Sequence, residues 1–430
     1  MRVEEKFMKR RAVLACCLFL ALGGPLEAEH YSVSIPPAAG AKYKEANFAL
    51  WIPEDVDMLR AVIVHQHGCG EPAEMAGATA TFDLQWQALA KKWDCALMGS
   101  SYRMNTACND WCSPENGSGP AFLRALAHFA EQSGHEELTR IPWALWGHSG
   151  GAEWVYRMFA QHSQRVLVLV LRSGPPFMER LYTESSATPV LYNIGVKEKE
   201  DRQFGGIWRK ATELFEARRA LGALDTWAPD PEASHDCRFG RFFVIPYIDA
   251  CLAQRLGPPG SRLMKPVDMA RSWFGNIKTG ETGPAARYDG EPHETTWLPN
   301  ERIALMWQEF VRTGWVMDKT PPPSPTNLEA TVVEPNAVTL RWQAEADLDS
   351  GIKTFRIYRN GARITTNAGS GQDLFQKPNY HDTLDKPLHE MVCADSDVAV
   401  GTAYTYEVTA VNWCDLESIK SEPLTVTIGR

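Results

Sequence analysis

Short apolar runs alternate with amphipathic stretches through the first three quarters of the chain. Runs that predict buried strands cover 47–52, 60–65, 95–99, 141–146, 166–171 and 189–194. Apolar residues recur at helical spacing over 82–93, 120–132, 151–162, 207–221, 242–256 and 300–313, the last with Asn300 as its predicted N-cap. The stretch 257–294 shows little periodicity. Strands that alternate with helices predict a mostly parallel sheet with helices on both faces.

A proline-rich stretch, 320–325, marks a change in this pattern and predicts a stiff, extended linker. Beyond it, residues 338–342, 354–358 and 404–410 alternate between apolar and polar side chains, as half-buried β-strands do. Asn360-Gly361 follows the second of these runs and is a tight-turn signal. About a hundred residues with this pattern predict an all-β, immunoglobulin-like sandwich.

The first residues predict an export signal. Three basic residues, Lys9 to Arg11, precede an apolar run, 12–22, and Ala28 is a small residue before the expected cleavage site. This run is too short to span a bilayer comfortably, and no later run is long and apolar enough for a membrane helix. We therefore expect an exported protein, secreted or periplasmic. Acylation of Cys16 or Cys17, as in a lipoprotein, ranks second.

These patterns divide the 430-residue chain into two folded parts. The expected boundaries are 1–28 for the signal peptide, 29–318 for an α/β catalytic domain, 319–325 for the linker and 326–430 for the sandwich. The net charge of −9 argues against a nucleic-acid-binding protein. Eight cysteines remain after the signal, and this even number permits disulfides in an exported protein.

The most informative motif is Gly147-His148-Ser149-Gly150-Gly151, which lies between a predicted strand and a predicted helix. It has the form G-x-S-x-G, the nucleophile elbow, in which the serine sits on a tight and strained turn. Small residues must flank such a turn, and the following helix points its first N–H groups toward the serine. Ser149 is therefore the predicted nucleophile.

A serine nucleophile needs a base to take its proton, and the base needs an acid to orient it. In sheets of this type the three residues follow the chain order serine, acid, histidine. Glu198 is the first acid after the predicted strand 190–194, so it is the predicted acid. Asp201 is the second candidate and Glu200 the third.

His235 is the predicted base, because it lies in a loop just before a predicted helix and imidazole titrates near neutral pH. His293 competes for this role but lies beyond the helix that should close the sheet. His148 is within the elbow and is expected to point elsewhere. These assignments place the whole active edge within residues 29–318.

Negative charge that develops on a substrate oxygen needs two N–H donors, the oxyanion hole. We expect these donors to be the amides of Gly150, directly after the nucleophile, and of Cys69, in His67-Gly68-Cys69 after an early strand. The Cys69 side chain is expected to pack or to form a disulfide. The pair His65-x-His67 has no third ligand at a convincing spacing, so we expect no metal and no other cofactor.

The elbow, His67-Gly68-Cys69 and the late His235 together resemble the α/β-hydrolases. Within that fold they are similar to secreted polyhydroxybutyrate depolymerases and to feruloyl or acetylxylan esterases. The resemblance covers roughly residues 45 to 316 and implies an α/β-hydrolase fold, with the amide after His-Gly in the oxyanion hole. A glutamate at the acid position departs from the commoner aspartate of these families.

The second domain resembles fibronectin type III domains. Pro325, Trp342, Tyr358 and Tyr404 fall where that fold has its first-strand proline, its buried tryptophan and its characteristic tyrosines. Such domains recur in bacterial polymer-degrading enzymes as spacers or accessory modules. The resemblance therefore implies a role near a polymer only by analogy.

These features lead to one principal hypothesis, a secreted serine esterase with a Ser-His-acid acyl-enzyme mechanism. Its partner would be an ester substrate, polymeric or a fragment of a polymer, such as a polysaccharide ester or a polyester, with no nucleic acid and no membrane span. A peptidase or lactonase of the same fold is the nearest alternative. A non-catalytic extracellular binding or adhesion protein is the alternative from a different functional class.

Overall fold

The computed structural model describes residues 28–70, 77–104, 109–174, 186–333, 337–364, 380–382, 384 and 391–429. The predicted signal peptide, 1–28, lies outside this part of the chain except for its last residue. Among the described residues, no helix combines the length and apolar character needed to cross a bilayer.

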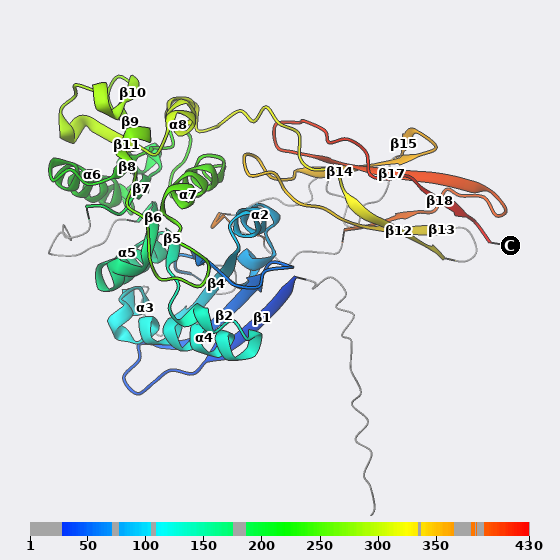
Figure 1. Cartoon of the computed structure of the whole chain (residues 1–430), viewed down its shortest axis with the longest axis horizontal. Coiled ribbons are helices and arrows are strands. Elements are labelled where there is room, and N and C mark those ends of the chain that lie inside the picture. The colour runs from blue at the N-terminus through cyan, green and yellow to red at the C-terminus, as the bar shows by residue number, and fades with distance from the viewer. Residues whose placement is uncertain are drawn as a thin grey trace, which may run out of the picture.

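A large mixed sheet organises the first domain (Figure 1). Its strand order is β1-β2-β4-β3-β5-β6-β7-β8. The first two pairings are antiparallel, and all neighbours from β4 to β8 are parallel. The strands are β1 (Glu29–Ile35), β2 (Tyr43–Ile52), β3 (Ala61–Gln66), β4 (Cys95–Met104), β5 (Trp143–His148), β6 (Val166–Arg172), β7 (Val190–Asn193) and β8 (Asp225–Trp227).

The apolar runs of the sequence form the middle of this sheet. Every residue of β3, β5, β6 and β7 is buried, as expected for parallel strands that are covered on both faces. The prediction of an α/β domain with a mostly parallel sheet is confirmed at this level. Two strands were not expected, because all but the last residue of the edge strand β1 are exposed or half-buried and β8 has only three residues.

Helices pack on both faces of the sheet, each over its own apolar core (Figure 1). One core contains side chains of α3 (Asn109–Cys112), α4 (Ser118–Ser133), α5 (Gly150–His162) and α6 (Gly205–Ala220). The other contains side chains of α2 (Leu84–Lys92), α7 (Arg241–Arg255) and α8 (Glu301–Thr313). The Asn300 side chain accepts a hydrogen bond from the Ile303 amide at 2.9 Å, so the predicted cap of α8 is confirmed.

Short elements fill the connections between these helices and strands. A small antiparallel sheet with the order β10-β9-β11 lies within and just after the stretch that showed no periodicity. Its strands are β9 (Trp273–Asn276), β10 (Thr282–Pro284) and β11 (Thr295–Leu298), which are too short to produce a clear pattern. The 3₁₀ helices are η1 (Gly77–Phe82), η2 (Pro114–Asn116), η3 (Glu136–Thr139), η4 (Ser163–Arg165), η5 (Val196–Glu200), η6 (Met269–Arg271), η7 (Ala285–Arg287) and η8 (Pro292–Glu294).

The second domain is a sandwich of two antiparallel sheets, as predicted (Figure 1). Side chains of both sheets share one core that includes Leu340, Trp342, Ile357 and Tyr406. One sheet contains β12 (Thr326–Val333), β13 (Ala337–Gln343) and β16 (Val392–Asp395). The other contains β15 (Ala362–Ile364), β14 (Thr354–Arg359), β17 (Ala403–Val411) and β18 (Leu424–Thr427).

The two domains are in direct contact. Leu84 of α2 packs in one buried cluster with Ala346, Ile352 and Ala410 of the sandwich. Near the predicted linker, the Asp318 carboxylate accepts hydrogen bonds from the side chains of Asn412 and Ser350 at 3.0 and 2.7 Å. The sandwich is therefore held against the first domain by apolar packing as well as by buried polar contacts.

Candidate active site

Ser149 lies at a sharp turn between β5 and α5. Its backbone angles are φ 56° and ψ −123°, a left-handed conformation that side chains rarely adopt. Holding such a residue costs on the order of 1–3 kcal/mol, which the surrounding structure must supply. The Ser149 amide donates to the carbonyl of Arg172 on β6, and the Ser149 carbonyl accepts from the amides of Ala152 and Glu153. These bonds fix the turn from both sides.

The glycines of the motif leave room for this turn. A Cβ atom added to Gly147 would stand 2.4 Å from the carbonyl oxygen of Gly151. A Cβ atom on Gly151 would stand 2.2 Å from the carbonyl oxygen of His67. Any side chain at either residue would therefore push the helix away from the strand or from the segment that follows β3.

Ser149, His235 and Glu198 form a continuous hydrogen-bond chain. The Ser149 Oγ lies 2.8 Å from His235 Nε2, and His235 Nδ1 lies 2.9 Å from Glu198 Oε1. Ser149 is only partly buried, whereas the side chains of His235 and Glu198 are 5 % and 0 % exposed. The Phe204 ring stacks on the imidazole with a centroid distance of 3.7 Å. The serine can therefore be reached from outside, while the two groups behind it are shielded from water.

The backbone explains why Glu198 faces the histidine. Glu198 lies in η5, directly after β7, and His235 lies in the loop after β8. The amides of Val196 and Lys197 donate to the carbonyls of Asp230 and Ala233, so the two loops are tied together. The other predicted acids lie elsewhere. Asp201 caps the turn before α6 by accepting from the Gln203 and Phe204 amides, and Glu200 is exposed.

The predicted oxyanion donors lie beside the serine. Gly150 is the first residue of α5, and the first amides of a helix have no acceptor within the helix. A Cβ atom added to Gly68 would stand 2.9 Å from Ser149 Cβ, so the backbone before Cys69 is in contact with the nucleophile. Cys69 is disulfide-bonded, which was one of the two expected states of its side chain.

Buried histidines surround the elbow. Burial lowers the pKa of His65, and lowers the pKa of His67 and His148 far below its ordinary value, so these side chains are neutral. The His65 ring stacks on Trp146 at 3.9 Å. Neither ring nitrogen of His67 has a hydrogen-bond partner among the described residues. The described part of the chain also contains no group of three or more side chains arranged to hold a metal ion.

His148 and Arg172 hold the loop that carries His235, a role that the sequence did not indicate. His148 Nε2 donates to the His235 carbonyl oxygen at 2.6 Å. Arg172, which is 1 % exposed, donates to the carbonyl oxygens of Asn193 and Asp236. The sequence offered one signal of this role: Arg172 directly follows the predicted apolar strand 166–171, and an arginine there needs hydrogen-bond partners if it is buried. The competing base, His293, has a 53 % exposed side chain beside Glu294 on η8 and takes no part in this site.

Residues of the second domain reach the site, so the expectation that the active edge lies wholly within residues 29–318 is wrong. His381 Nδ1 lies 3.0 Å from His148 Nδ1, and the Cys237 amide donates to the Tyr380 carbonyl at 3.0 Å. The Tyr380 ring is 6.3 Å from the His235 ring, and the residue is 46 % exposed. A half-exposed aromatic side chain from the sandwich therefore stands beside the predicted base.

Asp382 anchors this contact. Its carboxylate accepts from Arg241 Nε at 2.7 Å and from the Trp86 indole at 3.1 Å, and it lies 3.4 Å from His65 Nε2. Arg241 also donates to Asp83 at 2.8 Å. Arg241, Trp86, His65 and Asp83 all belong to the first domain and are buried. The contact is a buried, multiply bonded ion pair between domains.

Comparisons with known proteins identify no relative for the whole chain. No family profile matches it, and no curated protein matches it. Similar solved structures include one titled "Myokine structure", 20 % identical over 25 % of this chain and 99 % of that chain, with a TM-score of 0.17. An Fn3-like protein from Clostridium thermocellum is 22 % identical over 26 % of this chain and 97 % of its own, with a TM-score of 0.16. The family 28 exopolygalacturonase of Yersinia enterocolitica is 18 % identical over 25 % of this chain and 21 % of its own, with a TM-score of 0.19. At these scores the similarities support no conclusion about this chain.

Proposed function

We propose that this protein is an exported serine esterase of the α/β-hydrolase type. The single observation that carries the proposal is the hydrogen-bond chain from Ser149 Oγ through His235 to Glu198, at 2.8 and 2.9 Å, on a strained strand-to-helix turn. The chain order serine, acid, histidine is the order of the α/β-hydrolases. The second domain is proposed to be of the fibronectin type III kind.

In this proposal Ser149 attacks the carbonyl carbon of an ester. His235 Nε2 takes the hydroxyl proton as the Oγ–C bond forms, and Glu198 holds the Nδ1 proton and stabilises the imidazolium. The negative charge on the former carbonyl oxygen faces the amides of Gly150 and Cys69. The imidazolium then gives its proton to the leaving alcohol. Water, activated by the same histidine, attacks the acyl-enzyme and releases the carboxylic acid.

Several observations bear on how a substrate ester reaches the site. Ser149 is partly exposed, whereas His235 and Glu198 are buried, so only the nucleophile is presented to a substrate. The half-exposed ring of Tyr380 stands beside His235 and offers an apolar surface on which an acyl or alcohol group can pack. The predicted export signal and the second domain favour a substrate outside the cell, such as a polymer ester or its fragments.

A substrate panel tests this proposal. Purified protein without residues 1–28 would be assayed with p-nitrophenyl acetate, longer p-nitrophenyl esters, a feruloyl sugar, polyhydroxyalkanoate film, a lactone and a chromogenic peptide. Hydrolysis of at least one carboxylic ester, lost in Ser149→Ala, is the expected result. Turnover of the lactone or the peptide without any ester would favour the peptidase or lactonase alternative. No turnover of any substrate by folded protein would favour a non-catalytic binding protein.

A further inference from the structure

A cavity of about 1370 Å³ lies at the edge of the sheet opposite Ser149. Its wall includes residues that lie within three positions before a strand: Arg140 before β5, Arg165 before β6, Ala187 before β7 and Leu224 before β8. The candidate catalytic residues follow β5, β7 and β8 instead. Because these strands are parallel, residues before and after them lie at opposite ends of the sheet. The cavity is therefore separate from the site described above.

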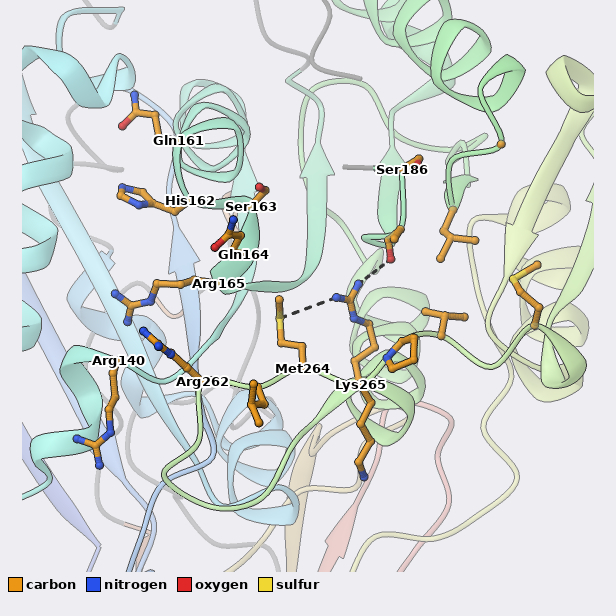
Figure 2. Close-up of a pocket in the computed structure, with 18 of the residues that line it drawn as sticks. Arg140, Gln161, His162, Ser163, Gln164, Arg165, Ser186, Arg262, Met264 and Lys265 are labelled. Atoms are coloured by element: carbon orange, nitrogen blue, oxygen red, sulfur yellow. Dashed lines mark hydrogen bonds between the residues drawn. The ribbon is translucent and has the colours of Figure 1, made fainter. Parts of the chain in front are cut away.

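The wall of this cavity is strongly cationic. It contains Arg140, Arg165, Arg255, Arg262 and Lys265, and none of the described residues that line it is an aspartate or glutamate. Among the described residues, none of these five cations forms an ion pair. Figure 2 shows the side chains of Arg140, Arg165 and Arg262 on the same side of the cavity, with Lys265 across from them. The chain as a whole has a net charge of −9, so five cations without an ion pair around one cavity are an unusual local concentration of positive charge.

Arg255 is the clearest sign that the cavity is built for a ligand. It is 5 % exposed, and its guanidinium donates to the Ala187 carbonyl at 2.9 Å and lies 3.9 Å from the Met264 sulfur. Its Nε–H has no partner among the described residues. Burial lowers the pKa of Arg255 to about 10, because its charge is poorly solvated. A buried cation in this state is stabilised by any anion that enters the cavity.

Arg165 presents a second, well-ordered guanidinium to the cavity. It stacks over the Trp143 ring at 4.1 Å and donates to the Ile141 carbonyl at 2.9 Å. Its Nε–H also lacks a partner among the described residues, and burial lowers its pKa to about 10. Stacking fixes the plane of the guanidinium, so its donors keep one direction. Two guanidinium groups held in fixed directions in one wall suit planar or tetrahedral oxyanions.

We propose that this cavity binds a small ligand that carries at least two carboxylate, sulfate or phosphate groups. A single ion would neutralise only part of five cations. The volume also exceeds the roughly 300–1,000 Å³ of ordinary small-molecule sites, so it admits a molecule of oligosaccharide size. Apolar side chains in the same wall, Leu224, Val267 and Leu263, provide surface for the uncharged part of such a ligand. The feature common to these candidate ligands is an oxyanion group repeated along a short molecule.

Calorimetric titration of the full mature chain tests this proposal. The anionic probes are trigalacturonate, which carries spaced carboxylates, and tripolyphosphate; maltotriose is the uncharged control of similar size. We expect at least one anionic probe to bind, with a Kd that rises steeply with salt, and maltotriose not to bind. The tighter probe tells which oxyanion the cavity prefers. Failure of both anionic probes to bind at millimolar concentration, or equal binding of maltotriose, would overturn the proposal.

Two exposed cations provide the matched variants. Arg262→Gln with Lys265→Gln should raise the Kd about tenfold, since each lost charge near the surface is worth up to about 1 kcal/mol. Arg287→Gln with Lys44→Gln makes the same change of net charge at exposed residues outside the cavity wall and should leave the Kd within about twofold. Equal weakening by both pairs would show general charge attraction and would contradict a specific site.

Arg255→Gln gives a sharper test if the variant folds. It should weaken the preferred probe more than the exposed pair does, because the buried guanidinium loses no contact to water when the ligand binds. All these variants should hydrolyse p-nitrophenyl acetate like the parent protein, since the serine lies at the other edge of the sheet. If Arg255→Gln does not fold, the exposed pair and its control still decide the question.

Discussion

The two ends of the same parallel strands differ in whether several of their buried charged side chains have charged or titratable partners. At the carboxyl end, Glu198 bonds to His235 and Arg241 is shared by Asp83 and Asp382, whereas Arg172 donates only to neutral oxygen acceptors. At the amino end, Arg255 is buried and Arg165 is half-buried, and the Nε–H of each has no acceptor among the described residues. A buried pair of opposite charges fixes the positions of both side chains. A charge without such a partner is stabilised when a ligand of opposite charge binds to it. The difference suggests that one edge is built for chemistry and the other for binding.

The two edges also differ in which domain supplies them. The carboxyl end is completed by Tyr380, His381 and Asp382 from the sandwich. The wall of the amino-end cavity comes from residues 139–269 of the first domain. Changes to the sandwich should therefore reach the candidate active site and leave the cavity alone. Variants that act on one edge and spare the other test this comparison.

The largest expected effect is that of Ser149→Ala. Loss of the nucleophile should lower kcat for p-nitrophenyl acetate by about 10⁶-fold, the scale found when a triad serine is removed. Ser163→Ala, at the cavity edge, is the matched control and should change kcat by less than about twofold. Steady-state kinetics with freshly purified protein measures both. A loss of less than about tenfold in Ser149→Ala would assign the activity to another group.

The next effect is that of the acid. Glu198→Gln keeps the size of the side chain but removes the charge that orients and stabilises the imidazolium, so kcat should fall by about 10²–10⁴-fold. Asp201→Asn and Glu200→Gln should stay within a few fold, because Asp201 only caps a turn and Glu200 is exposed. The same kinetic assay ranks the three. A severe defect in Asp201→Asn with a mild one in Glu198→Gln would contradict the hydrogen-bond chain.

The sequence predicted most of what is local in this site. Ser149 was found because the elbow is a contiguous motif, and Glu198 because it is the first acid after β7. The helix cap at Asn300 and the strands of the sandwich also follow from patterns of a few residues. In each case the signal and the structure occupy the same short stretch of chain.

The sequence did not predict contacts that join distant stretches. Asp382 reaches Arg241 across 141 residues, and nothing near Asp382 indicates a buried ion pair. Similarly, the basic cavity gathers Arg140, Arg165 and Arg255, which are separated in sequence by apolar strands and helices. Single arginines in such positions look like ordinary surface residues until the sheet places them at one edge.

The interdomain ion pair should matter for stability. Asp382→Asn leaves Arg241 buried with Asp83 as its remaining carboxylate, and breaking a buried pair costs about 3–5 kcal/mol. We expect the Tm to fall by about 5–10 °C in differential scanning calorimetry. Asp397→Asn removes a 96 % exposed partner of Arg359 and should shift the Tm by no more than about 1 °C. Equal shifts in both variants would mean that the interdomain contact is not buried in solution.

The last effect, which vanishes at neutral pH, is a dependence of stability on pH that His381 introduces. Burial lowers its folded-state pKa to about 4, against 6.5 in the unfolded chain, with His235 and His65 adding to the shift. Between these values the unfolded chain binds more protons, so acid favours unfolding, and above pH 6.5 the effect vanishes. His381→Asn can still donate to His148 but cannot titrate. Its unfolding free energy should gain up to about 1.4 kcal/mol per pH unit relative to the parent as pH falls from 6.5 to 4.

Urea denaturation at several pH values between 7 and 4.5 measures that difference. A constant gap between parent and His381→Asn across the range would show that His381 is solvated in the folded protein. That result would also contradict the placement of the neighbouring Tyr380 beside His235.

The central claim, that Ser149 is a nucleophile activated by His235 and Glu198, is tested most directly by covalent labelling. The folded protein would be treated with a fluorophosphonate probe, digested and mapped by mass spectrometry. We predict one adduct, on the peptide that contains Ser149, with no labelling of Ser149→Ala and much slower labelling of Glu198→Gln. An adduct of equal yield on another serine, or no adduct on folded protein, would contradict the account.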